Sequence, residues 1–195
     1  MAEQEDRELR AAAPPGRLKR TIVLIGMMGS GKTAIGKSLA ARLEVPFLDS
    51  DHEIEAAAAA SIAEIFERDG EAFFRDRETE VIRRLLRGAP FVLSTGGGAW
   101  LAERNRRIIA ASGTALWLDA DLELLWERVR HRATRPLLRT ADPKGTLARL
   151  LEERAPLYAL AGLRVKGDPR FSIADMTDHV LRTLAAHPDI LEPAR

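Results

Sequence analysis

Two kinds of segment alternate along the chain, distinguished by the spacing of their apolar residues. Short runs of apolar and β-branched residues fit buried strands, at 21–25, 46–49, 91–94, 114–118 and 163–166. Between these runs, apolar residues recur every three or four positions, as they do on one face of a helix. Apolar strands separated by helices are typical of a parallel sheet covered on both faces. The pattern therefore predicts an α/β fold of three layers, α/β/α, with a five-stranded parallel sheet.

Several helix boundaries are marked by residues with known positional preferences. Ser61 followed by Glu64 is a capping box, and the helix that it opens should stop near Gly70. A longer helix should run from about Glu71 to the pair Arg87-Gly88. The alanine run at 56–60 is interpreted as a tightly packed helix.

The segment between the first strand and the first helix has the spacing G-x-x-x-x-G-K-[ST], running from Gly26 to Thr33. Its glycines allow successive backbone N–H groups to point inward, and the positive end of the following helix adds to this cradle for phosphate. Lys32 can then reach the β- and γ-phosphates, while the Thr33 hydroxyl can ligate Mg²⁺. A glycine-rich turn without a ligand is the weaker alternative, because the strand-loop-helix context of a P-loop is present.

Composition limits the other classes of function. The chain has 195 residues, 46% of them hydrophobic, which is enough for one sizeable core. A single domain is expected over 18–187, with a disordered extension at 1–17 and a frayed tail at 188–195. The net charge of +1 gives no general signal for nucleic acid, and the chain has no cysteine and no apolar run of 18 residues. A cytoplasmic protein without nucleic-acid or membrane partners is expected.

Basic residues are concentrated in one segment. Five arginines without an intervening acid stand at Arg128, Arg130, Arg132, Arg135 and Arg139. Such a local cluster suits a polyphosphate better than a nucleic-acid duplex. Closing this segment over an anionic nucleotide would relieve the repulsion among these charges. A solvated basic loop is the alternative.

Two acids follow the second predicted strand, at Asp49 and Asp51. Residues two apart on an extended chain point the same way, so both should project beyond the carboxyl end of the sheet, where open α/β folds bind ligands. One acid can hold Mg²⁺ while the other accepts the proton of an attacking hydroxyl. Alternatively, the two acids complement the dipole of the next helix. Beside a P-loop, the first interpretation is favoured.

The P-loop, followed by Phe47-x-Asp49-x-Asp51, resembles the shikimate kinase family. Four later blocks are similar to that family in the same order, and together the matches cover about 20–186: Phe74-Arg75-x-x-Glu78, Ser94-Thr-Gly-Gly-Gly98, Arg135-Pro-Leu-Leu138 and Arg154-Ala-Pro-Leu-Tyr158. The resemblance implies a P-loop containing nucleoside triphosphate hydrolase fold and the phosphorylation of the 3-hydroxyl of shikimate. It also implies ATP as co-substrate, one Mg²⁺ per subunit, and a lid at about 130–142, and a monomer is expected.

The resemblance also implies roles for individual residues. Lys32, Asp51 and Arg135 would be catalytic, and Thr33 and Asp49 would hold the metal. Shikimate would meet Asp51, Arg75, Gly97, Gly98 and Arg154. ATP would meet Gly29, Ser30, Gly31, Lys32, Thr33, Ala34, Arg128 and Arg135. Arginine forks suit a carboxylate, and Glu78, one helical turn from Arg75, can hold that side chain in place. Without the resemblance, Arg75 and Arg154 would be interpreted as ordinary surface residues.

Other functions fit the sequence less well. A small P-loop kinase for gluconate or a nucleoside monophosphate would share the cradle and the lid, but it has no obvious use for Asp49 and Asp51 together with both substrate arginines. A GTPase is excluded because its N-K-x-D motif cannot occur: Asn105 is the only asparagine and Arg106 follows it. A DNA-binding regulator would need an added helix-turn-helix, which the 17 leading residues cannot supply.

Overall fold

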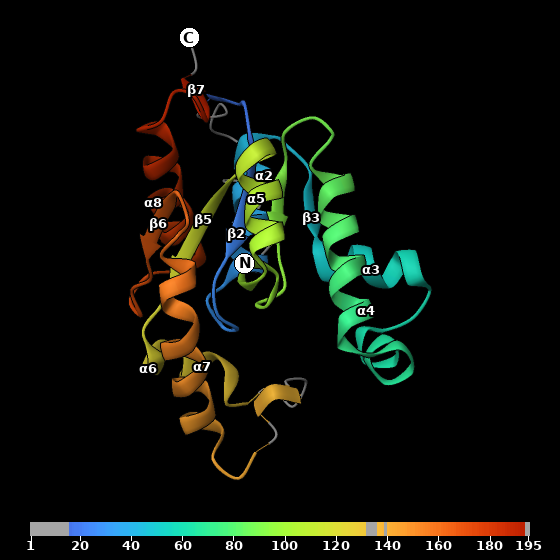
Figure 1. The fold of residues 1–195 in the computed structure, drawn as a ribbon. Coiled ribbons are helices and arrows are strands. Elements are labelled where there is room, and N and C mark those ends of the chain that lie inside the picture. The colour runs from blue at the N-terminus through green and yellow to red at the C-terminus, as the bar shows by residue number, and fades with distance from the viewer. Residues whose placement is uncertain (1–15, 132–135, 139, 194–195) are drawn as a thin grey trace.

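The computed structural model describes residues 16–131, 136–138 and 140–193 (Figure 1). Its centre is a five-stranded parallel sheet with strand order β3-β4-β2-β5-β6. The strands are β2 (Thr21–Ile25), β3 (Phe47–Asp49), β4 (Val92–Ser94), β5 (Gly113–Asp119) and β6 (Leu163–Lys166). All five predicted strands are therefore confirmed, with ends that differ by one residue at most.

Helices cover both faces of the sheet. Ile22 and Leu24 of β2 pack in one buried cluster with α2 (Lys32–Leu43) and α8 (Ile173–Ala185). Val23 and Ile25 point to the opposite face, as alternate residues of a strand must. There they pack with α4 (Ile62–Leu85), α5 (Glu103–Ser112), α6 (Leu122–Val129) and α7 (Pro143–Tyr158). The predicted three-layer α/β/α architecture is confirmed.

A smaller cluster joins α4 to α3 (Ser50–Ala58), at the β3 edge of the sheet in Figure 1. It contains Ile54, Ile65, Phe74 and Val81. The alanine run lies largely outside this cluster, since Ala56, Ala57 and Ala59 are exposed. The interpretation of 56–60 as tightly packed is wrong, because Ile54 alone provides the fully buried apolar contact of α3.

Helix α4 begins and bends where the sequence predicts. Both halves of the capping box are present, with Ser61 N donating to Glu64 Oε2 at 2.7 Å and Glu64 N donating to Ser61 Oγ at 3.3 Å. Gly70 has φ 82° and ψ 173°, a backbone conformation that interrupts the helix and that only glycine adopts readily. The second half ends at Leu85 instead of Arg87, because buried Leu86 leaves the helix as its C-cap.

The two ends of the described chain pair with each other. Strand β1 (Gly16–Leu18) runs antiparallel to β7 (Leu191–Pro193). Ile190 and Leu191 are buried against the cluster of α2 and α8, and Lys19 N donates to Ile190 O at 2.8 Å. The predicted disorder at 16–17 and the predicted fraying at 188–193 are therefore wrong. The chain stays ordered beyond Pro188 because Ile190 and Leu191 are apolar and pack against the cluster of α2 and α8. Residues 1–15, 194 and 195 lie outside the described part.

Because the five strands are parallel, their carboxyl ends meet at one edge of the sheet, where the loops that follow β2, β3 and β4 gather. The loop after β4 leads into a short 3-10 helix, η1 (Ala99–Leu101), and a second one, η2 (Pro136–Leu138), precedes α7. In the described residues, no helix is long and apolar enough to cross a membrane.

Candidate active site

The loop from Gly26 to Thr33 joins β2 to α2 and has the backbone of a phosphate cradle. Gly26, Gly29 and Gly31 all have positive φ, at 140°, 84° and 97°. At Gly29 a Cβ atom would lie 2.7 Å from Val129 Cγ1, so a larger residue would clash with α6. The glycine spacing is thus required by both conformation and packing.

Three polar side chains belong to this P-loop. Lys32 Nζ donates to Gly26 O at 2.8 Å and to Met27 O at 3.0 Å, so the ammonium bridges the start of the loop. Ser30 is buried, and its Oγ has no hydrogen-bond partner in the described structure. Thr33 and Ala34 are exposed in the first turn of α2. The loop therefore places an ammonium and a hydroxyl together at the N-terminus of a helix, which favours anions.

Asp49 ends β3 and lies beside the P-loop. Its Oδ2 accepts from the Thr33 hydroxyl at 3.4 Å, and its Oδ1 accepts from Asp51 N at 3.1 Å as the N-cap of α3. Asp49 thus caps α3, as the alternative of two acids at the start of a helix allows, and it contacts Thr33 at the same time. Two oxygen atoms from Thr33 and Asp49 face one position, a donor set that suits a hard cation such as Mg²⁺.

Asp51 lies in the first turn of α3, between the P-loop and the glycine triplet at 96–98. A Cβ atom at Gly96 would lie 2.6 Å from Asp51 Oδ1, so the carboxylate sits against that backbone. Burial raises the pKa of Asp51 to about 6, and Asp49 and Glu55 add to the rise, while Lys32 and Arg75 oppose it. A carboxylate with such a pKa can accept a proton near neutral pH.

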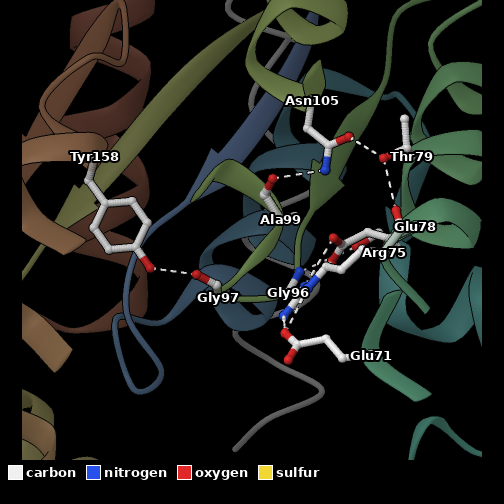
Figure 2. A network of polar contacts seen from close by, with 10 residues as sticks. Glu71, Arg75, Glu78, Thr79, Gly96, Gly97, Ala99, Asn105 and Tyr158 are labelled. Carbon is white, nitrogen blue, oxygen red and sulfur yellow. Dashed lines mark hydrogen bonds and ion pairs between the residues drawn. The ribbon is translucent and has the colours of Figure 1, made fainter. Parts of the chain in front are cut away.

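Arg75 projects from α4 toward the same loop (Figure 2). It pairs with Glu78 at 3.0 Å and with Glu71 at 3.2 Å. Glu78 is 1% exposed, and burial raises its pKa while Arg75 opposes the shift. A Cβ atom at Gly98 would lie 2.8 Å from Arg75 Nη1, so a larger residue there would displace the guanidinium from its present position. The expected role of Glu78 as a partner that orients Arg75 matches this geometry.

Arg154 approaches the loop from α7, on the other side. Its Nη1 lies 3.7 Å from the Cβ position of Gly97. Burial raises the pKa of Tyr158, one turn further along α7, and the nearby charge of Arg154 opposes this rise. The two arginines predicted to meet the substrate therefore flank the triplet Gly96–Gly98.

The nucleotide side of the site contains Arg128, at the end of α6. Its Nη1 donates to Gly29 O at 3.3 Å, and burial lowers the pKa of the guanidinium. Arg128 thus lies against the P-loop, where the sequence places it. Arg135, the remaining residue predicted to touch ATP, lies outside the described residues, as does much of the predicted lid.

A cavity of about 710 Å³ connects these groups. The P-loop, Asp49, Asp51, Gly96, Gly97 and Arg128 line it. Gly98 is outside this lining, as are Arg75 and Arg154, which lie against Gly98 and Gly97. Phe171, Ser172, Ile173 and Met176 also line the cavity, and the sequence did not single them out. Their only signal is position: they follow β6, whose carboxyl end faces the same edge of the sheet.

Comparisons with known proteins agree on one family. A family model described as shikimate kinase matches residues 28–185. The shikimate kinase of Ruegeria pomeroyi is 64% identical over 175 residues, which are 90% of each chain. That of Cereibacter sphaeroides is 59% identical over 176 residues, 90% of this chain and 88% of the relative.

Solved structures give the same result. A shikimate kinase from Acinetobacter baumannii in complex with shikimate superimposes with a TM-score of 0.80 at 35% identity, covering 93% of this chain and 97% of that one. A gluconokinase from Sinorhizobium meliloti has a TM-score of 0.56 at 21% identity over 87% and 94% of the two chains, and so shares the fold.

Proposed function

This chain belongs to the shikimate kinase family, which phosphorylates the 3-hydroxyl of shikimate with ATP, and we propose that it performs this transfer in the cavity between its P-loop and glycine triplet. The products are shikimate 3-phosphate and ADP. The transfer serves chorismate and aromatic amino-acid synthesis in the cytoplasm. The observation that carries the proposal is the position of Asp51, which faces the P-loop on one side and the triplet on the other.

Asp51 accepts the proton of the attacking hydroxyl. As the 3-oxygen forms its bond to the γ-phosphorus and the bond to the β,γ-bridging oxygen breaks, the hydroxyl proton passes to the carboxylate and ADP leaves. A pKa of about 6, raised by burial and by Asp49, makes this carboxylate a stronger base than an exposed aspartate while leaving it largely ionised at neutral pH.

Lys32 stabilises the charge that develops on the transferred group. Its Nζ lies at the start of the P-loop, 3.0 Å from Met27 O, and a lysine at this place in the motif reaches the β- and γ-phosphates. Thr33 and Asp49 fit one Mg²⁺, since their oxygen atoms lie 3.4 Å apart. The bound ion would neutralise phosphate charge and keep most of its other ligands as phosphate and water.

Arg75 and Arg154 hold the carboxylate of shikimate, and the backbone of Gly97 and Gly98 meets its ring hydroxyls. Planar guanidinium groups can bind a carboxylate with two parallel hydrogen bonds, which fixes its orientation. The two arginines reach the triplet from different helices, α4 and α7. They would thus fix one end of shikimate and leave its 3-hydroxyl to Asp51.

Arg128 and Arg135 bind the nucleotide. Arg128 contacts the P-loop at Gly29 O and would lie near the adenine. Arg135 would add positive charge over the transferred phosphoryl group, with the segment at about 130–142 acting as the lid.

A coupled assay of ADP release with shikimate, gluconate and nucleoside monophosphates tests the function. Turnover with shikimate should exceed turnover with either alternative by at least about 100-fold in kcat/KM. Shikimate holds its carboxylate and hydroxyls on a rigid ring, whereas gluconate is an open chain and nucleoside monophosphates have no carboxylate. Equal or faster turnover with gluconate would refute the proposal.

A further inference from the structure

Two backbone carbonyls of the loop after β4 are held by buried side chains from different helices. Tyr158 of α7 donates its hydroxyl hydrogen to Gly97 O at 2.7 Å, and Asn105 of α5 donates from Nδ2 to Ala99 O at 2.9 Å. Figure 2 shows the two contacts on opposite sides of the loop. Glycine gives this loop no side chains of its own with which to fix its shape. The two contacts therefore add to those of the Gly96 backbone, whose N donates to Ser50 Oγ at 3.3 Å and whose O accepts from Ala99 N at 3.1 Å.

Tyr158 joins the loop to the arginine of α7. The tyrosine is fully buried, and its hydroxyl and Arg154 Nη1 lie 3.9 and 3.7 Å from the same Cβ position at Gly97. In a trans peptide the N–H points away from the preceding C=O. By fixing the direction of Gly97 O, the phenol therefore also fixes the direction of the Gly98 N–H.

Asn105 joins the loop to the arginine of α4. It is fully buried, and its Oδ1 lies 2.8 Å from the Thr79 hydroxyl. That hydroxyl also lies 2.9 Å from the backbone oxygen of Arg75, so it shares its one hydrogen between the two acceptors. Thr79 follows Glu78, the buried partner of Arg75. The chain of contacts thus runs from the loop to the helical turn that carries Arg75.

We propose that Tyr158 and Asn105 are positioning residues for shikimate. They hold the glycine loop at a fixed position relative to Arg154 on one side and Arg75 on the other. Neither side chain lines the cavity. Each acts through groups that meet the substrate: Tyr158 through Gly97 and Arg154, and Asn105 through Ala99 and the α4 turn. This inference rests on the proposed function, because it assigns the two residues to the site that binds the acceptor.

Tyr158→Phe tests the first half, because it removes one hydroxyl and keeps the ring that packs against Trp117. Loss of the hydrogen bonds should raise the KM for shikimate by about 3- to 10-fold. The Kd for ATP should change by less than about twofold, since the P-loop keeps its own contacts. Steady-state kinetics with each substrate varied, and ATP titration by calorimetry, give these values.

Thr177→Val is the matched control. It also removes one fully buried hydroxyl, which bonds Ser38 Oγ at 2.9 Å and Ile173 O at 2.7 Å in the layer of α2 and α8. The control should lose thermal stability without a change in the KM for shikimate. The inference is overturned if Tyr158→Phe leaves that KM within about twofold of the parent, or if the control raises it as much.

The second half is tested by Asn105→Ala and, in case that variant does not fold, by Thr79→Val, which leaves the Asn105 side chain in place. Either change should raise the KM for shikimate and spare the Kd for ATP; an unchanged KM in a folded variant overturns this half. A parent protein inactive with shikimate would instead refute the proposed function itself. The two failures are therefore distinguishable.

Discussion

At the scale of single residues, the ionisation of Asp51 should govern the pH dependence of the rate. Its pKa is raised from 3.8 to about 6, mainly by burial. Because the base must be ionised, kcat/KM for shikimate should rise tenfold per pH unit below this pKa and level off above it. A pH-rate profile measures this. A profile that is flat between about pH 5 and 7 would contradict the role of Asp51.

Because of the same pKa shift, ionised Asp51 should lower the free energy of unfolding at neutral pH. The folded state holds its proton up to a pH of about 6, whereas an unfolded aspartate loses its proton near 3.8, so the free energy of unfolding falls as the pH rises between these values. Asp51→Asn should therefore abolish most turnover yet increase stability at neutral pH by about 1–3 kcal/mol. Urea unfolding should show this gain shrink by more than half at about pH 4.5. A loss of stability at neutral pH would contradict the argument.

Replacing Arg75 or Arg154, the two arginines beside the glycine triplet, should impair the use of shikimate and leave ATP binding unchanged. Arg75→Ala and Arg154→Ala are each expected to cost about 2–5 kcal/mol in kcat/KM for shikimate, the range for truncating one partner of a buried charge pair. The Kd for ATP should barely change. Arg77→Ala is the control, because Arg77 is on the same helix but forms an exposed pair with Glu80. A comparable loss in this control would show that charge on α4, and no specific contact, is responsible.

Local spacing predicted the residues whose partners are close in sequence, and missed those whose partners are remote. Asp49 ends the predicted strand β3 and Glu78 is one helical turn from Arg75, so both could be placed. The extended-chain argument was wrong for Asp51, because α3 begins at Ser50 and places Asp51 in its first turn. Tyr158 and Asn105 could not be assigned, because Gly97 lies 61 positions from Tyr158, and Thr79 lies 26 from Asn105. Only the folded chain brings those groups together.

At the scale of elements, the bend in α4 depends on one residue. Gly70 has φ 82°, and a Cβ there would meet nothing within 4 Å, so the cost of replacing it lies in the backbone alone. Gly70→Ala should destabilise the protein by about 1–3 kcal/mol in chemical unfolding. Gly88→Ala is the matched control: its φ is not positive, its Cβ would be 3.8 Å from Leu85 O, and little loss is expected. Similar losses in both variants would contradict the conformational argument.

The elements of the sheet were predictable because each β-rich run is apolar and bounded by turn residues. The strands β1 and β7 were not predictable, because each is three residues long and pairs with a segment at the other end of the chain. Such pairing leaves no periodic signal. The burial of Ile190 and Leu191 favours this pairing, and that burial requires α2 and α8 to be packed together.

At the scale of the whole molecule, the end of the chain should contribute to stability. Leu191 is fully buried against the layer of α2 and α8. Leu191→Ala should cost about 2–5 kcal/mol by removing buried apolar atoms and leaving a cavity. Glu192→Ala, which breaks a solvent-accessible pair with Arg17, should cost at most about 1 kcal/mol. Denaturant unfolding of both variants provides the comparison, and equal losses would contradict this account.

The described residues form one five-stranded sheet with helices on its two faces and the small β1–β7 pair, and we propose a single domain that works as a monomer. The order of strands and helices was enough to predict the architecture, because a parallel sheet requires crossover helices. The exact extent of the domain could not be predicted, because it depends on the pairing of β1 with β7.

The pairing of Gly16 with Pro193 turns the described chain into an almost closed ring. Partners across antiparallel strands have Cα atoms about 5 Å apart, so a linker of a few residues could join them. New ends could then be opened at the exposed turn around Gly88, between α4 and β4. In such a circular permutant the glycine triplet would be synthesised before the P-loop, which reverses the natural order. The order of synthesis would change while every partner in the fold stayed the same.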